Sequence, residues 1–65
     1  MKIQYDPVAD VLSVLLSEGP VEESDQNKPG LILDYEKKGN VVGVGILDAS
    51  KRMGNPRLVE YAVTR

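Results

Sequence analysis

The 65-residue chain contains no cysteine and no histidine. Without cysteine it has no disulfide, no zinc–thiolate site and no thiol nucleophile. Without histidine it lacks the usual imidazole ligand and general base. Phenylalanine and tryptophan are also absent, which leaves three tyrosines as the aromatic residues. These absences exclude the commonest metal and catalytic sites.

Long apolar runs are missing as well. No stretch approaches the roughly 20 apolar residues that span a bilayer. The N-terminal sequence MKIQYDPVAD has no apolar run typical of a signal peptide. We therefore expect a cytoplasmic protein with no membrane partner. The formal net charge of −2 argues against a general polyanion-binding surface.

The length predicts a single small domain over residues 1–65. A chain this short buries only about 60% of its unfolded surface. Small domains offset a thin core with disulfides, metals or oligomerisation. Because this chain has no cysteine and no histidine, oligomerisation remains, and we expect a homodimer. Acidic residues predominate before Asn27, and basic residues predominate after Ser50. This split would favour association between copies.

Short apolar and alternating segments predict a mainly β fold, with a small α+β fold as the alternative. We expect an antiparallel meander of five or six short strands with one or two single-turn helices. Asp6–Asp10 and Asp48–Met53 are predicted as the helical turns. The segment 57–65 favours a final strand, with a helix as the alternative. The predicted strands before it cover residues 2–5, 11–17 and 21–26, and two more lie within 30–50.

The segment Gly30–Ser50 is the densest apolar stretch and predicts a hairpin. Lys37-Lys38-Gly39 suits a three-residue loop with a bulge. That loop places Tyr35 opposite Val41, Leu33 opposite Gly43 and Leu31 opposite Gly45. Both hairpin faces are then apolar, so we expect curling of the sheet, the C-terminal segment or a second chain to cover them. Gly43 and Gly45 leave space that Tyr35 or Tyr61 would fill.

Two segments carry a family resemblance. The sequence KIQYDPVAD at residues 2–10, followed by GLILDYEKKGNVVGVGILDAS at residues 30–50, resembles the DUF2283 family of small bacterial proteins of unknown function. The family-like region is residues 1–50, and residues 51–65 form a C-terminal extension. The resemblance implies a compact, mainly β domain and an antitoxin-like role beside a small toxin. It supplies no catalytic residues.

Four carboxylates are candidates for chemistry. Asp6 and Asp48 are predicted to cap turns, and Asp10 lies in the first of these turns. Asp34 is the least explained, because it shares a predicted face with Ile32 and Val42. A carboxylate among apolar side chains marks a candidate functional site. The alternative function is therefore a small ligand-binding protein or enzyme that uses Asp34 and nearby tyrosines, from the set Tyr5, Tyr35 and Tyr61.

The leading hypothesis is a non-catalytic protein-interaction module that self-associates, with an antitoxin-like role. We predict no catalytic, cofactor-binding or metal-binding residues. The acidic run Glu22–Asp25 lacks the ordered ligands of a calcium loop, so we interpret it as a solvated edge that discourages pairing with other molecules. A third and weaker hypothesis is nucleic-acid binding through Lys51, Arg52 and Arg57.

Overall fold

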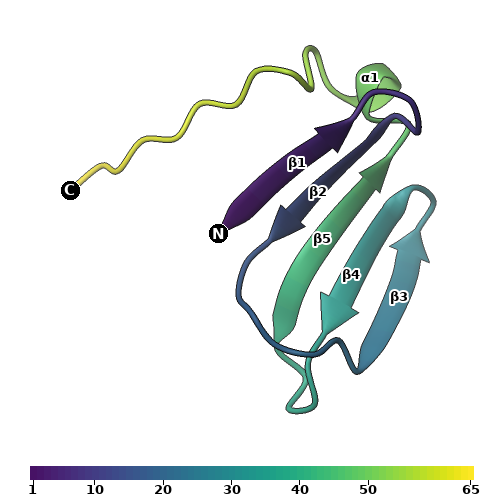
Figure 1. The fold of residues 1–65 in the computed structure, drawn as a ribbon, viewed down its shortest axis with the longest axis vertical. Coiled ribbons are helices and arrows are strands. Elements are labelled where there is room, and N and C mark those ends of the chain that lie inside the picture. The colour runs from purple at the N-terminus through teal and green to yellow at the C-terminus, as the bar shows by residue number, and fades with distance from the viewer.

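The computed structural model describes all residues from 1 to 65 and forms one five-stranded antiparallel sheet (Figure 1). The strand order is β1-β2-β5-β4-β3. This confirms the mainly β prediction, with five strands and one short helix. The elements are β1 (Lys2–Asp6), β2 (Val11–Leu15), β3 (Glu23–Lys28), β4 (Leu31–Tyr35), β5 (Val41–Leu47) and α1 (Ala49–Arg52).

The β1–β2 connection is a hydrogen-bonded turn at residues 7–10 and is not helical. An Asp6 carboxylate oxygen accepts hydrogen bonds from the amides of Val8 (2.9 Å) and Ala9 (3.1 Å). Asp6 therefore caps the turn as predicted, in the way an aspartate closes an Asx turn. Asp10 ends the turn in the left-handed conformation, with φ 58°. Few residues other than glycine, asparagine and aspartate adopt this conformation.

The β4–β5 hairpin has the predicted loop but a different register. The Glu36 amide donates to the Asn40 carbonyl (2.9 Å), and Gly39 has φ 91°. Tyr35 lies opposite Val41 as predicted. A bulge then shifts the pairing by one residue, so Leu33 lies opposite Val44 and Leu31 opposite Ile46. The predicted pairing of both leucines with glycines is wrong, because the bulge adds one residue to β5.

The edge strand β3 begins two residues later than predicted and continues through Lys28. All six of its residues are exposed. One side of β3 pairs with β4, and no strand lies on its other side. The sheet therefore ends in a strand that carries Glu23 and Asp25.

The helix α1 is a single turn directly after β5. Asp48 is its N-cap residue, with φ 52°, but makes no side-chain capping hydrogen bond. Asp48 therefore occupies the predicted N-cap position, but the prediction that its side chain caps the turn is wrong. The amide of Ser50 instead donates to a carboxylate oxygen of Asp10 (2.9 Å). Asp10, from the β1–β2 turn, thus accepts the amide hydrogen bond that an N-cap side chain usually accepts.

Residues 57–65 form neither the expected strand nor the alternative helix. In Figure 1 this segment extends away on the β1 side of the sheet with no strand beside it. Its alternating pattern suits a strand, but a strand requires a hydrogen-bonded neighbour, and the chain provides none here. No helix of the structure has the length and apolar character needed to span a bilayer.

The core is thin, because one sheet has no second layer packed against it. Six residues of 65 are buried, and the apolar ones with side chains in the core are Leu12, Val42 and Ala49. The molecule measures 34 × 33 × 18 Å. Neither face of the sheet is covered along its whole length by the chain's own residues.

Candidate functional site

One face of the sheet, called here the apolar face, is built from aliphatic and tyrosine side chains. Pairing places Ile3 beside Val14, Leu12 beside Ile46, and Leu33 beside Val44. Because side chains alternate between faces along a strand, these residues share one side of four adjacent strands. The apolar face consists of Ile3, Tyr5, Leu12, Val14, Leu31, Leu33, Val44 and Ile46.

The chain covers one corner of the apolar face. Pro56 is buried, and with Arg57 and Val59 it borders a hollow over Ile3, Tyr5 and Leu12. The Arg57 guanidinium lies 5.8 Å from the centre of the Tyr5 ring, a distance suited to a cation–π contact. The rest of the face stays partly exposed. Burial of the apolar surface that these side chains still expose to water would be favourable.

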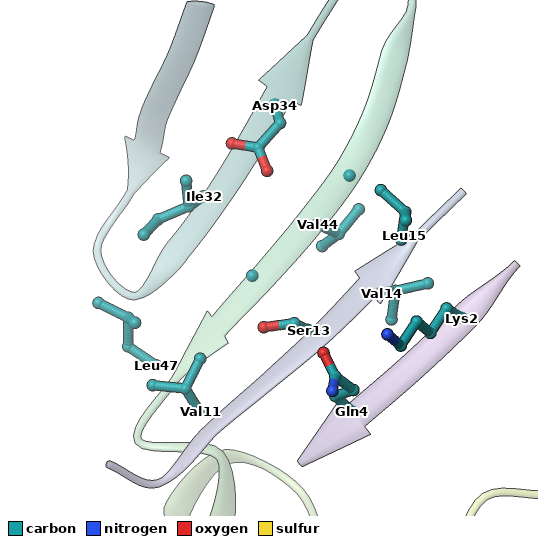
Figure 2. A pocket seen from close by; sticks show the side chains of 12 residues that line it. Lys2, Gln4, Val11, Ser13, Val14, Leu15, Ile32, Asp34, Val44 and Leu47 are labelled. Carbon is teal, nitrogen blue, oxygen red and sulfur yellow. The ribbon is translucent and has the colours of Figure 1, made fainter. Parts of the chain in front are cut away.

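The opposite face, called here the hollow face, contains a shallow cavity of about 470 Å³ (Figure 2). Figure 2 shows Asp34 and Ile32 on one side of β5 and Ser13, Gln4 and Lys2 on the other. Gly43 and Gly45 form the floor between them. Because the two glycines lack side chains, the surface of this face is depressed along the middle of β5.

Asp34 is half-buried on the hollow face. The Ser24 hydroxyl donates to one of its carboxylate oxygens at 2.6 Å. A Cβ atom on Gly43 would lie 2.8 Å from the other oxygen, so the carboxylate occupies the space above that glycine. The prediction that Tyr35 or Tyr61 fills the space is wrong. No tyrosine lines the cavity either, so the expected pairing of Asp34 with tyrosines is also wrong.

A second polar cluster, called here the Asp10 clasp, joins the β1–β2 turn to α1. One Asp10 oxygen accepts from the Tyr5 hydroxyl (2.7 Å) and from the Ser50 amide (2.9 Å). The other oxygen accepts from the Ser50 hydroxyl at 2.7 Å. The Ala49 amide also donates to the Asp10 carbonyl at 2.9 Å. The clasp therefore fixes the start of α1 from 40 residues away.

Hydrogen bonding in the clasp changes the acidity of two groups. The Ser50 hydroxyl first, and then the Tyr5 hydroxyl, hold the pKa of Asp10 below its ordinary value of 3.8. The hydrogen bond to Asp10 raises the pKa of Tyr5 above 10.0, and partial desolvation adds to this. Both shifts follow from donors that favour the ionised carboxylate and the neutral phenol. The clasp is a structural link, since every donor in it is already engaged.

The sequence offers Asp10 as a candidate carboxylate but does not predict the clasp. Its partners are separated along the chain by 5 and 40 residues. The one local signal is the Asp-Ala-Ser sequence at residues 48–50, which predicts a cap at Asp48 and not at Asp10. A contact of such long range has no spacing rule by which a single sequence could reveal it.

The remaining candidates are dispersed. Arg52 lies against Gly30, where a Cβ atom would collide with its guanidinium. Arg57 stacks on Tyr5, and Lys51 is exposed. The three cations proposed for nucleic-acid binding thus lie on and beyond α1, and two of them contact the protein itself. The structure gathers no group of three or more acidic side chains that could hold a metal ion.

Comparison with family models matches residues 2–50 to the family described as "Protein of unknown function (DUF2283)". The match covers the whole sheet and the start of α1. The chain belongs to the DUF2283 family. Neither the curated proteins nor the solved structures give a match to it. The DUF2283 region therefore holds both faces and the Asp10 clasp, whereas residues 51–65 lie outside it.

Proposed function

We propose that this DUF2283 protein is a non-catalytic protein-interaction module that forms a homodimer through its apolar face. The observation that carries the proposal is a row of aliphatic side chains across four strands that the chain covers at one corner only. Two such faces pack about 10 Å apart in sheet-on-sheet structures. A second copy would supply the missing layer of core.

The distribution of polar side chains supports a partner for the apolar face in preference to the hollow face. The hollow face carries Lys2, Gln4, Ser13 and Asp34 around its glycine floor. Covering it would remove charged and polar groups from water at a cost. None of the eight residues that define the apolar face is charged, and the charged side chain placed against it is Arg57, over Tyr5 at one corner. Burial of the apolar face therefore carries less of this cost.

The test is a matched pair of substitutions with equal exposure on opposite faces. Ile3 on the apolar face is 37% exposed, and Leu15 on the hollow face is 38% exposed. Ile3→Asp is expected to weaken self-association at least tenfold, because it places a charge in the interface. Leu15→Asp is expected to leave the dimerisation constant unchanged. Sedimentation equilibrium measures both, with circular dichroism to verify folding. Equal effects of the two substitutions would refute the assignment of the face.

The antitoxin-like role is a finer proposal that rests on the family resemblance. In a dimer closed by the apolar faces, the hollow faces remain outside and available to a small protein such as a toxin. Co-purification of the neighbouring gene product with the wild-type chain, and its loss with Leu15→Asp, would support this role. Retention of the product by Leu15→Asp would count against the hollow face. The cytoplasmic location remains a prediction from the sequence.

The second candidate function is ligand binding in the cavity of the hollow face. It is favoured by the half-buried Asp34, which lines one cavity together with Ser13, Gln4 and Lys2 from the other side of β5. A small ligand with a cationic group is expected to pair with Asp34. Screening small cationic compounds by chemical-shift changes tests it. Shifts at Gly43 and Gly45 that disappear in Asp34→Asn would support the site, and a screen without such shifts would end the idea.

A further inference from the structure

The chain has one segment built like a strand that pairs with nothing. Residues 57–65 are called here the tail. Their alternate side chains are Arg57, Val59, Tyr61, Val63 and Arg65, an apolar centre between two arginines. Tyr61 is 75% exposed and Val63 is 80% exposed. The amides of Arg57 and Leu58 donate to Asn55. The amides of residues 59–65 find no partner in the chain, although the alternation of the segment is that of a half-buried strand.

The sheet has two edges that could accept this strand, and they differ in charge. The edge strand β1 carries Lys2 and Asp6, which cancel. The edge strand β3 carries Glu23, Asp25 and Lys28 and follows Glu22. Two copies of β3 would repel each other, because their carboxylates would lie side by side. The tail carries Arg57 and Arg65 at its ends and Glu60 on its other face, so its side-chain charge is positive and complementary to β3, which favours the tail over a second β3.

The geometry of stacked sheets brings the tail to the β3 edge of a second copy. All neighbouring strands are antiparallel, so β1, β5 and β3 point the same way. A two-fold axis between the sheets and parallel to the strands places the partner's β3 edge above β1. The tail extends away on the β1 side (Figure 1). The chain's own β3 lies four strand spacings away, roughly 19 Å, whereas the partner's sheet lies about 10 Å above.

The size of the apolar face also calls for an added contact. The four strands of the apolar face have a width of roughly 19 Å and a length of about 17 Å, or a projected area of about 320 Å². A standard interface buries about 800 Å² on each partner. Two exchanged tails, each laying Val59, Tyr61 and Val63 along the partner, would extend the interface beyond the sheet footprint.

We propose that the tail of each copy pairs as an added strand with the β3 edge of a second copy. This inference rests on the proposed self-association and specifies how it is completed. Arg65 then lies near the acidic residues of the partner's β3, as does Arg57 once it leaves the Tyr5 ring, and the free amides of the two strands are satisfied. The tail is ordered on dimerisation and stays unpaired in the monomer.

Crosslinking between two populations of chains tests the pairing, because the natural chain has no cysteine. One population carries Tyr61→Cys, and the other carries Gln26→Cys in β3. A short bismaleimide is expected to join them as a mixed dimer. The control population carries Gln4→Cys in β1, the other edge, and is expected to give at least tenfold less mixed product with Tyr61→Cys. Dominant crosslinking to Gln4→Cys would overturn the proposal.

Proline substitutions in the tail give a second test. Because the tail is unpaired in the monomer, these substitutions should leave the fold of the monomer intact, and a change in the dimerisation constant can be assigned to the tail. Either Tyr61→Pro or Ala62→Pro must remove an amide that faces the partner, and at least one is expected to weaken dimerisation tenfold or more. If both dimerise like the wild type and no crosslink forms, the tail inference fails while the dimer of the proposed function stands. If the wild type is a monomer by sedimentation, both fail together.

Discussion

The two faces of the sheet are built from alternate residues of the same strands, yet they differ in what they leave unsatisfied. The apolar face presents branched aliphatic side chains that have no second layer packed over most of them. The hollow face replaces side chains by Gly43 and Gly45 and fills the space with the carboxylate of Asp34. The difference teaches that apolar content alone does not mark an interface. What marks it is apolar surface that the chain covers at one corner only and that is built without a charged side chain.

The largest expected effect comes from shortening a side chain on the apolar face. Leu12 is 8% exposed, and its neighbour Val11 is half-buried on the hollow face. Leu12→Ala should cost about 2–4 kcal/mol of the free energy of unfolding, because it leaves a cavity in the small core. Val11→Ala should cost about 1 kcal/mol, since less of its surface leaves water on folding. Urea unfolding monitored by circular dichroism measures both, and equal costs would erase the contrast between the faces.

The next effect concerns the glycine floor. A Cβ on Gly43 would displace the Asp34 carboxylate and its hydrogen bond from Ser24. A Cβ on Gly45 would meet Ile32 at 3.7 Å, an ordinary contact. Gly43→Ala should therefore be less stable than Gly45→Ala by about 1–2 kcal/mol. Thermal unfolding of the two variants tests this. If Gly43→Ala were the more stable variant, Asp34 would not need the space above that glycine.

The smallest effect is the pH dependence that the Asp10 clasp contributes. The pKa of Asp10 is lowered in the folded protein, so the unfolded chain takes up this proton first as the pH falls. The clasp thus stabilises the fold above about pH 4, and this contribution is lost as the pH falls through the lowered pKa. Asp10→Asn should lower the Tm at pH 7 and flatten its fall below pH 4.

A control for the clasp is Ser50→Ala, which removes the donor with the largest influence on the Asp10 pKa. It should flatten the acid dependence of the Tm in the same direction as Asp10→Asn while leaving the charge of the chain unchanged. An acid dependence identical to that of the wild type in both variants would contradict the clasp.

Local patterns predicted most of the sheet. Apolar alternation, Asp6 and the Lys-Lys-Gly loop gave the strand positions, the first turn and the hairpin loop, because each depends on residues near in sequence. The register beyond Tyr35 was wrong, because the bulge in β5 has no signature that single residues display. The tail was predicted as a strand from alternation alone, although a strand also needs an edge to pair with.

The candidate sites were less accessible to sequence. Asp34 stood out because it interrupts an apolar pattern, and the structure places it in a cavity. Its neighbours Lys2, Gln4 and Ser13 come from β1 and β2, on the other side of β5, and only the sheet order brings them near. The clasp between Asp10 and Ser50 likewise depends on the return of the chain after β5.

The most direct test of the central claim is the molar mass of the wild-type protein by sedimentation equilibrium at micromolar concentration. One chain has a mass of 7.1 kDa. If a second copy covers the apolar face, the measured mass should approach twice that value and return toward 7.1 kDa on dilution. A well-folded protein that stays at 7.1 kDa up to the highest concentration measured would contradict the account.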